Sequence, residues 1–305
     1  MTRLLITGAS GLLGLNLALI AHALGYEVVG WANDSFMLQA QFPVLQVNLL
    51  DTAQIRGRIK EMNPGMIIHC AALASLEGSE ADPELAKRLN AEVPGEIARV
   101  ALEHDIKMIH ISTDAVFDGK RGGYIEADTP SPMNVYAQTK LEGEQAVSSA
   151  NKEAIIARVN FYGWSLSGKR SLAEFFYNNL SQNLTVNGFK DVFFCPLYTR
   201  QLGETLFEMA GKGLRGLYHV LSSEILSKYE FGVKLAQKFG FDDKLVNPIT
   251  LNESGLTVTR SPNMTLSVKK LQRDLGHIMP GQDECLDSFY QDYQAGLPGQ
   301  IKACL

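Results

Sequence analysis

The sequence of 305 residues lacks the features that mark several classes of protein. Its apolar runs stop well short of the about 20 residues that a membrane-spanning helix needs, and its first residues enter an apolar strand instead of a signal-peptide pattern. It also lacks an excess of positive charge. The formal net charge is −5, which offers no electrostatic attraction for nucleic acid or an anionic membrane. We therefore expect a cytoplasmic, soluble protein that binds neither.

Cysteine is scarce, and its spacing excludes a zinc site. The four cysteines, at positions 70, 195, 285 and 304, lie far apart, without a CxxC pair and without a histidine at metal-binding distance in the sequence. This usage suits a reducing compartment and predicts no metal site. Cys70 lies in an apolar run and is expected to serve as small core packing.

What the sequence does contain is an alternation of apolar strands with segments of helical period. This alternation is typical of a parallel sheet covered by helices on both faces. It predicts an α/β fold, a Rossmann-type doubly wound parallel sheet with a smaller C-terminal substrate lobe. Strands are expected at residues 3–7, 27–31, 44–47, 66–71, 107–112 and 154–159. Helices are expected at residues 12–24, 52–62, 83–104 and 136–149.

The pattern becomes less regular after Gly163, where the segments are shorter and aromatic residues more frequent. We expect a Rossmann domain at residues 1–163 and a smaller mixed α/β substrate-binding lobe at residues 164–305. Some strands of the second part are expected to return to the first sheet. Since no low-complexity linker separates the two parts, they should pack around a shared cleft at the carboxyl ends of the strands.

Gly8, Gly11 and Gly14 lie between the first expected strand and the first expected helix. In that position glycines let the backbone approach a pyrophosphate, and the start of the helix offers free N–H groups and a favourable dipole. The alternative, a turn that serves only to pack the helix on the strand, does not explain the position at the start of a βαβ chain. The turn predicts a dinucleotide site.

The end of the second strand bears on the choice between NAD(H) and NADP(H). Asn33 and Asp34 follow it, and no basic residue occurs from position 26 to 42. A carboxylate suits the ribose hydroxyls of NAD, so Asp34 favours NAD. Asp34 is also a plausible turn residue, and Asn33 or Ser35 can bind a phosphate. Asn48 and Leu49 either bracket the adenine or precede a helix cap.

Tyr136 and Lys140 stand four residues apart on an expected helix, so both side chains point the same way. A nearby ammonium favours the phenolate and should lower the pKa of the tyrosine, which could then exchange a proton with an alkoxide. Ser112 and Thr113 end the fifth strand, where a hydroxyl can polarise a substrate carbonyl or simply cap a turn.

Other polar residues are less decisive. His69 and His110 lie inside apolar strands and are expected to be core or rim residues. Asn90 either orients the lysine or lies on the surface. The small side chains of Ala71 and Ala72 allow a cofactor to lie against the backbone or a helix to pack closely.

Taken together, these motifs resemble the extended short-chain dehydrogenase/reductases, and within them the dTDP-4-dehydrorhamnose reductase family. The resemblance rests on the glycine turn, the run from Ser112 to Gly119, Tyr124-x-Glu126-x-Asp128, and Asn134-Val135-Tyr136 with Lys140, Glu142 and Glu144. Leu217-Tyr218-His219 and Ser227-x-Tyr229-Glu230-Phe231 extend it into the second lobe. It implies hydride transfer from a nicotinamide to a 4-keto sugar on a nucleoside diphosphate, with Thr113, Tyr136 and Lys140 as the catalytic residues.

The resemblance also implies the remaining site residues. The cofactor contacts are Gly8, Ser10, Gly11, Leu12, Leu13, Asn33, Asp34, Asn48, Leu49, Ala71, Ala72, Leu73, Ser112, Tyr136 and Lys140. The substrate contacts are Leu73, Thr113, Asp114, Asn160, Phe161 and Arg260. In a loop of the second lobe, the Arg260 guanidinium can hold a diphosphate or remain an ordinary exposed side chain.

Departures from the family pattern bear on the reaction. Related dehydratases carry a Glu directly after the Thr-Asp pair, and this chain has Ala115 there, so simple reduction is favoured over elimination. Leu73-Ala74 replaces a Tyr-Thr pair near the substrate. Two alternatives remain: a nucleotide-sugar epimerase that retains NAD, and a non-catalytic cofactor-binding regulatory subunit of the methionine adenosyltransferase beta type. A homodimer is compatible with this superfamily.

Overall fold

The centre of the molecule is a seven-stranded parallel sheet. The computed structural model describes residues 2–33, 40–254 and 261–304. The strand order is β11-β6-β5-β4-β1-β2-β3, so the chain runs outward from β1 in one direction and then in the other. The strands are β1 (Arg3–Thr7), β2 (Glu27–Ala32), β3 (Val44–Gln46), β4 (Met66–His69), β5 (Lys107–Thr113), β6 (Ile155–Val159) and β11 (Gly216–Val220). The predicted doubly wound sheet is confirmed.

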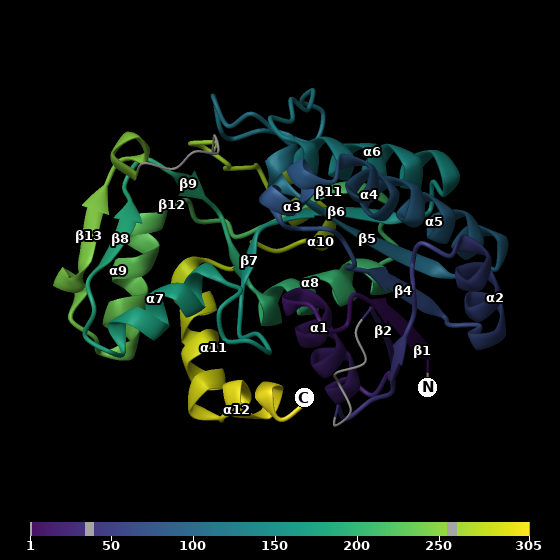
Figure 1. Ribbon diagram of the computed structural model, residues 1–305, viewed down its shortest axis with the longest axis horizontal. Helices are drawn as coiled ribbons and strands as arrows, with labels where there is room; N and C mark the ends of the chain where they lie inside the picture. The colour runs from purple at the N-terminus through teal and green to yellow at the C-terminus, as the bar shows by residue number, and fades with distance from the viewer. Residues whose placement is uncertain (1, 34–39, 255–260, 305) are drawn as a thin grey trace.

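Helices cover both faces of this sheet, as Figure 1 shows. One face carries α2 (Thr52–Met62), α5 (Val93–Glu103) and α6 (Val135–Ala150); the other carries α1 (Leu12–Ala23) and α8 (Thr199–Gly211). Successive side chains of β1 enter different cores: Leu4 and Ile6 pack with α1, while Leu5 packs with the apolar side of α2. Because both faces are buried, the strands read as continuous apolar runs.

The long helix expected at residues 83–104 is interrupted. It consists of α4 (Pro83–Lys87), a π-helical turn (Arg88–Glu92) and α5. The turn widens the helix at Asn90, whose carbonyl oxygen would lie 2.1 Å from a Cβ at position 143. Gly143 of α6 therefore provides the space for this π turn, a feature often found at functional sites. A short helix before it, α3 (Leu76–Ala81), was not expected; Ser75 caps it through a 3.0 Å bond from Gly78 N.

The smaller lobe lies to the left of the sheet in Figure 1, where β8 and β13 pair in parallel and α7 and α9 pack beside them. Its elements are β7 (Phe161–Tyr162), α7 (Leu172–Leu180), β8 (Val186–Phe189), β9 (Phe193–Phe194), β10 (Leu197–Tyr198), β12 (Leu226–Ser227), α9 (Lys228–Phe239), β13 (Val246–Ile249), α11 (Gln282–Gln294) and α12 (Leu297–Lys302). The helix α10 (Lys269–Leu275) packs against β11 of the central sheet. Short 3₁₀ turns occur at Asp114–Val116, Asp243–Leu245 and Leu251–Ser254.

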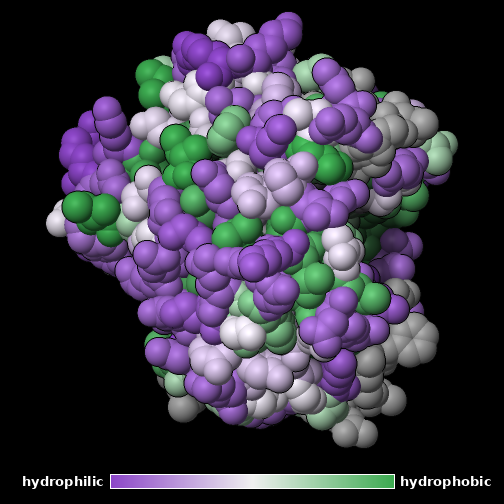
Figure 2. Space-filling model, turned by 90° about the vertical axis from the view of Figure 1, so that its left-hand side faces the viewer, coloured by the Kyte–Doolittle hydropathy of each residue, from purple (hydrophilic) through white to green (hydrophobic). Residues whose placement is uncertain are grey.

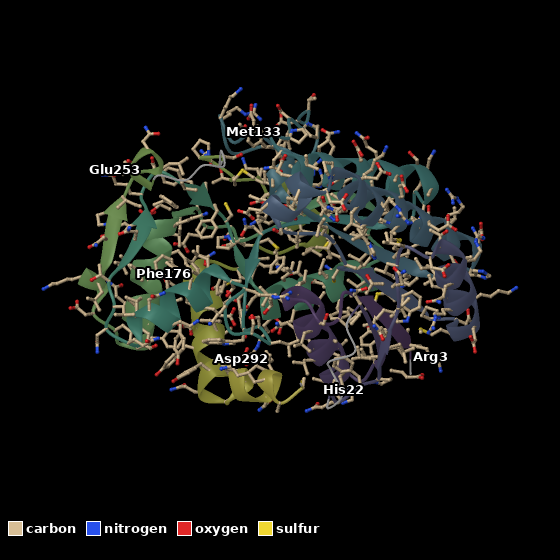
Figure 3. All side chains as sticks on the ribbon, in the orientation of Figure 1. Arg3, His22, Met133, Phe176, Glu253 and Asp292 are labelled. Atoms are coloured by element: carbon tan, nitrogen blue, oxygen red, sulfur yellow. The ribbon has the colours of Figure 1, made fainter. Side chains whose placement is uncertain are left out.

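Aromatic side chains fill the interior of this lobe. Trp164 stacks on Phe289 with ring centroids 4.2 Å apart, and Phe176 lies buried between α7 and α9, as Figure 3 shows. Asp292 of α11 accepts a hydrogen bond from the Tyr198 hydroxyl at 2.5 Å and pairs with Arg200. These contacts tie α11 to the start of α8.

The two parts of the chain share the central sheet. β11, which comes after residue 163 in the sequence, pairs in parallel with β6. The helix α8, from the same part of the sequence, packs on α1. The division at residue 163 remains a prediction.

The outer face of the smaller lobe is mostly hydrophilic, and its hydrophobic side chains form small separated areas in Figure 2. Within the described residues, no helix combines the length and the apolar character that crossing a membrane requires.

Candidate functional site

The glycine turn between β1 and α1 is tight, and each of its ends needs glycine. Gly8 has φ +68°, a conformation that L side chains rarely adopt. A Cβ at Gly14 would lie 2.2 Å from the Gly8 carbonyl oxygen. Gly11 N donates to that same oxygen at 2.9 Å. The turn therefore brings the first residues of α1 against the end of β1.

A cleft of about 740 Å³ opens beside this turn at the carboxyl ends of the strands. The predicted cofactor contacts that line it are Gly8, Ser10, Gly11, Leu12, Leu13, Asn33, Asn48, Leu49, Ala71, Ala72 and Leu73. Residues that were not predicted also line it: Gly14, Trp31, Ala32, Val47, Leu50, Cys70, Ala74, Leu85, Leu89 and Arg170. Phe161, predicted as a substrate contact, lines it too. Asp34 and Arg260 lie outside the described residues.

The cleft fits a dinucleotide. Its volume is that of an ordinary ligand pocket. The N-terminal residue that begins α1, Gly11, supplies no side-chain cap, so the helix presents backbone N–H groups and the positive end of its dipole to the cleft. A pyrophosphate can take the place of the absent cap, and the apolar walls around Trp31 and Val47 suit an adenine ring.

Thr113 and Tyr136 meet at the end of β5. Tyr136 is in the first turn of α6, which begins after the Asn134 cap, and its hydroxyl lies close enough to the Thr113 hydroxyl to be affected by it. Burial raises the pKa of Tyr136 to about 12, and the neighbouring Asp114 charge acts in the same direction, while the Thr113 hydroxyl opposes it. The phenol is therefore neutral at pH 7.

Lys140 lies one turn after Tyr136 on α6, but its ammonium hydrogen-bonds a backbone carbonyl group of β5 instead of the Tyr136 hydroxyl. Its Nζ donates to the Ile111 carbonyl oxygen at 2.7 Å, and the side chain is buried. Burial lowers the pKa of Lys140 to about 8, although the Glu144 carboxylate opposes this shift. The expectation that Lys140 lowers the pKa of Tyr136 is wrong for this structure, because burial and the Asp114 charge outweigh any effect of the lysine.

The hydroxyl of Ser112 binds a buried side chain. Its hydroxyl donates to Glu144 Oε1 at 2.5 Å. Both oxygens of Glu144 also accept hydrogen bonds from Arg158: Nε donates to Oε1 at 2.9 Å and Nη2 donates to Oε2 at 2.7 Å. Both side chains of this ion pair are buried. Arg158 Nη1 lies 3.3 Å from His219 Nε2. The sequence motif that contains Glu144 did not indicate that its carboxylate pairs with Arg158 of β6.

Asp114 and Asn160, two of the predicted substrate contacts, bind each other. Asn160 Nδ2 donates to Asp114 Oδ2 at 2.6 Å, and the Thr113 hydroxyl donates to Asp114 Oδ1 at 3.2 Å. Burial raises the pKa of Asp114 to about 6, against these two hydrogen bonds, which favour the carboxylate. The structure therefore places a weakly acidic carboxyl group beside the Thr113 and Tyr136 hydroxyls.

Asn90 supports the floor of the cleft. It is buried, its Oδ1 accepts from Leu73 N at 2.8 Å, and its Nδ2 donates to Leu73 O at 3.2 Å and to Thr139 Oγ1 at 3.1 Å. The alternative of a surface position is wrong. Asn90 holds the backbone of Leu73 and joins it to α6, which carries Tyr136.

His69 and His110 are core histidines, as expected. Their rings stack with centroids 5.6 Å apart, and Thr7 Oγ1 lies 2.7 Å from His69 Nδ1. Burial, aided by the Lys140 charge, lowers the pKa of His69 to about 3 and that of His110 well below its usual value. Among the described residues, no group of His, Cys, Asp and Glu side chains is arranged to hold a metal ion.

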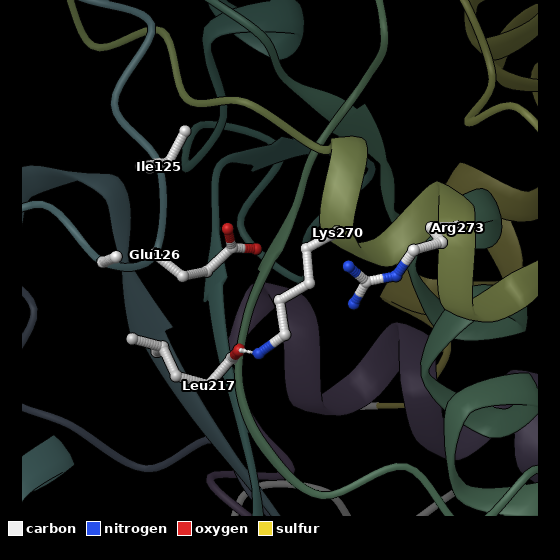
Figure 4. Close-up of a pocket in the computed structure, with 6 residues that line it drawn as sticks. Ile125, Glu126, Leu217, Lys270 and Arg273 are labelled. Carbon is white, nitrogen blue, oxygen red and sulfur yellow. Dashed lines mark hydrogen bonds between the residues drawn. The ribbon is translucent and has the colours of Figure 1, made fainter.

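A second, open pocket of about 510 Å³ lies at the outer edge of β11. Figure 4 shows Glu126, Lys270 and Arg273 around it. Lys270 Nζ donates to the Leu217 carbonyl oxygen at 2.7 Å, and Glu126 Oε1 accepts from His219 N at 3.1 Å. The two side chains thus satisfy outward-facing backbone groups of an edge strand, which would otherwise be open to pairing with another chain.

Comparison with known proteins gives a consistent result. The model of a family described as the RmlD substrate binding domain matches residues 1–295. The probable low-salt glycan biosynthesis reductase Agl14 of Haloferax volcanii is 31% identical over 297 residues, which cover 95% of this chain and 99% of that protein. Methionine adenosyltransferase 2 subunit beta of Rattus norvegicus is 30% identical over 279 residues, 88% of this chain and 81% of the subunit.

A solved structure agrees over almost the whole chain. The dTDP-4-dehydrorhamnose reductase of Bacillus anthracis, crystallised in complex with NADP, superposes with a TM-score of 0.84 and 26% identity. The match covers 95% of this chain and 99% of that one.

Proposed function

The chain belongs to the RmlD substrate binding domain family, within the extended short-chain dehydrogenase/reductases, and we propose that it is an NAD(P)H-dependent reductase of a nucleotide-linked 4-keto-6-deoxy sugar. The observation that carries this proposal is the pair of neighbouring hydroxyls, Thr113 at the end of β5 and Tyr136 at the start of α6, at the same edge of the sheet as the dinucleotide cleft.

The protonation state of Tyr136 suits the reductive direction. With a pKa raised to about 12, the phenol keeps its proton at neutral pH until a stronger base forms beside it. An alkoxide is such a base. Tyr136 is therefore a general acid whose proton transfer is coupled to the formation of the alcohol.

When bound in the cleft, a nicotinamide dinucleotide would supply the hydride that the carbonyl carbon gains. Thr113 donates a hydrogen bond to the carbonyl oxygen and stabilises the negative charge that develops there. Tyr136 delivers its proton to the same oxygen, so the ketone gains one hydride and one proton and becomes a secondary alcohol. The proton on Tyr136 is restored from solvent after product release.

The remaining residues hold and orient. Gly8, Gly11 and the start of α1 would receive the pyrophosphate, and Asn33, Asn48 and Leu49 would surround the adenosine. Lys140 would hold the nicotinamide ribose. The absence of a basic residue from position 26 to 42 favours NAD(H) over NADP(H).

A nucleoside diphosphate sugar is the substrate class that this family membership supports. Asp114, Asn160 and Phe161 are proposed to contact the sugar, and Arg260 the diphosphate. Ala115 follows Asp114 directly, so the general base that an elimination would need at this position is absent, and a dehydratase is disfavoured. The homodimer and the cytoplasmic location stay predictions.

The test is direct. Purified protein is incubated with NADH or NADPH and a dTDP-4-keto-6-deoxy sugar, and loss of the reduced nicotinamide absorbance is followed together with formation of the 4-hydroxy sugar. We expect turnover in wild type and not in Tyr136→Phe. Absence of cofactor oxidation with every nucleotide-linked keto sugar would overturn the proposal.

The two alternative functions make different predictions. An epimerase would retain bound NAD through purification and return it unchanged after each turnover. A regulatory subunit would bind the dinucleotide and a partner enzyme without turnover; the rat relative is named as the beta subunit of methionine adenosyltransferase 2. The presence of Thr113, Tyr136 and Lys140, together with the reductases among the relatives, favours the reductase over both alternatives.

A further inference from the structure

The dinucleotide cleft has an unusual charge balance. Among the described residues that line it, all are uncharged except Arg170. The pyrophosphate of a dinucleotide is doubly charged, and the dipole of α1 is equivalent to only about half an elementary charge. The glycine turn therefore leaves most of the pyrophosphate charge without a cationic partner.

Arg170 reaches the cleft from the smaller lobe. It lies between β7 and α7, far along the sequence from the glycine turn, and lines the same cleft. Its side chain is exposed, and no hydrogen bond or ion pair to its guanidinium is found within the described residues. An arginine in this state is available to a ligand.

The backbone of Arg170 is nevertheless held firmly. Its N–H donates to Glu174 Oε2 at 2.8 Å. Glu174 is buried, and the same carboxylate accepts from Ser171 N at 3.1 Å and from Ser165 N at 2.6 Å. Glu174 thus hydrogen-bonds the backbone at both ends of the loop from Ser165 to Ser171. The backbone that carries the Arg170 side chain is therefore fixed in place.

This loop is also attached to the cofactor helix. Asn16 of α1 donates from Nδ2 to the Trp164 carbonyl oxygen at 2.9 Å, and it accepts from Thr199 Oγ1 at 3.1 Å. Asn16 lies little more than one turn from the start of α1. The loop is therefore anchored near the phosphate end of that helix and not near the strand ends that would hold the adenosine.

On these grounds we propose that Arg170 binds the pyrophosphate of the dinucleotide from the smaller lobe, so that the cofactor joins this lobe to the Rossmann sheet. The inference rests on the proposed function. A guanidinium is suited to this role because its planar N–H groups match two phosphate oxygens at once, which an ammonium cannot do.

Three variants test the contact: Arg170→Gln, Arg170→Lys and Lys169→Gln. Lys169 is the matched control, since it is the adjacent exposed cation and does not line the cleft. Dissociation constants for NADH and NADPH are measured by fluorescence titration, and ADP and adenosine are then titrated as competitors. None of these readouts needs turnover.

We expect Arg170→Gln to weaken NADH, NADPH and ADP by about tenfold or more, the size of one charge-assisted contact, and to leave adenosine unchanged. Arg170→Lys should recover part of the loss, and Lys169→Gln should bind as wild type does. Raising the salt concentration should weaken wild type more than Arg170→Gln.

Equal binding of NADH by wild type and Arg170→Gln would overturn the inference and leave the proposed function intact. An equal loss of ADP and adenosine would also overturn it, because the damage would then not be specific to phosphate. If wild type itself binds neither NADH nor NADPH, the proposed function fails and this inference fails with it. Thermal unfolding of each variant confirms that an exposed side chain was replaced without loss of the fold.

Discussion

The dinucleotide cleft has one basic side chain among its described lining residues and the pocket at the edge of β11 has two, and these side chains differ in whether they already have partners. At the β11 edge, Lys270 binds a backbone carbonyl and lies 4.1 Å from the centre of the Tyr218 ring, and Arg273 pairs with Asp274. In the cleft, Arg170 has no such partner among the described residues, and the start of α1 has no side-chain cap. Binding capacity thus depends on which polar groups the protein leaves unsatisfied, more than on the presence of a pocket.

The two regions are joined by a buried polar chain. Ser112, next to Thr113, binds Glu144; Glu144 binds Arg158; Arg158 contacts His219, whose backbone N–H is held by Glu126 at the β11 edge. The five predictions that follow separate what each region contributes, in order of decreasing effect.

The largest effect is expected at the hydroxyl of Tyr136. Tyr136→Phe removes the proton donor and should lower kcat by about 10²–10⁴-fold while NADH affinity stays near that of wild type. The control is Tyr218→Phe at the β11 edge, which removes a hydroxyl that donates to Asp274 at 2.9 Å. Steady-state kinetics should show full activity for the control. A similar loss of kcat in Tyr136→Phe and Tyr218→Phe would contradict the assignment of catalysis to the cleft alone.

Next in size is the connecting ion pair. Glu144→Gln leaves the buried Arg158 charge without its counterion and should reduce the free energy of unfolding by about 3–5 kcal/mol. Glu103→Gln is the matched control, because Glu103 pairs with Arg56 at the surface, where such a pair contributes at most about 1 kcal/mol. Chemical denaturation measures both. An equally small loss of unfolding free energy in Glu144→Gln and Glu103→Gln would contradict the burial of the Glu144–Arg158 ion pair.

The carboxyl group of Asp114 should impose a pH dependence on stability. Its folded pKa is raised from 3.8 to about 6, so between these values the folded state binds the proton more tightly than the unfolded chain. Stability from this group is therefore present at low pH and is lost as pH rises from about 4 to about 6, by at most about 3 kcal/mol.

Asp114→Asn isolates this effect, because the buried histidines act in the opposite direction. The pKa of His69 is lowered to about 3, so that histidine stabilises the fold at neutral pH and costs stability as pH falls below its unfolded value. We expect the difference in unfolding free energy between wild type and Asp114→Asn to shift against wild type as pH rises through this window. A constant difference would contradict the raised pKa.

A smaller loss is expected at the glycine turn. Gly14→Ala places a methyl group 2.2 Å from the Gly8 carbonyl oxygen, so the turn must open, at a cost of about 1–3 kcal/mol and with loss of NADH binding. Gly57→Ala in α2, where a Cβ meets nothing within 4 Å, should instead stabilise the protein by up to about 1 kcal/mol. Thermal unfolding and NADH titration of both variants distinguish turn geometry from a general intolerance of alanine.

The smallest effect is expected at the β11 edge. Lys270→Met removes the bond to Leu217 O and should cost about 1 kcal/mol of stability or less, with NADH binding unchanged. Reduced NADH affinity in this variant would show that the two regions are coupled through the polar chain.

Much of the fold follows from short-range patterns. The boundaries of α2 agree with the expected ones, because Asp51 caps its start through Gln54 N and Asn63, in a left-handed conformation, ends it. The helix at residues 83–104 was expected as one regular element and contains a π turn, since that distortion depends on the space that Gly143 of another helix leaves for Asn90.

The candidate site likewise contains some residues whose positions follow from local sequence and others whose positions depend on tertiary packing. The expected contacts around Gly8, Asn48 and Ala71 do line the cleft, because each follows directly from the end of a parallel strand. Ser112, one residue before Thr113, has a hydroxyl that binds Glu144 instead, because side chains alternate along a strand and only tertiary packing shows which side holds a partner.

By itself, the sequence determined the unit of strand, glycine turn and helix at the start of the chain, the residues that end the parallel strands, and the spacing of Tyr136 and Lys140 on one helix. These depend on interactions within a few residues, where backbone geometry is decided by residue type. Tertiary structure alone decided the high pKa of Tyr136, the buried pair of Glu144 with Arg158, and the approach of Arg170 to the cleft. Each of these arises from burial or from partners far apart in the chain, and packing alone brings them together.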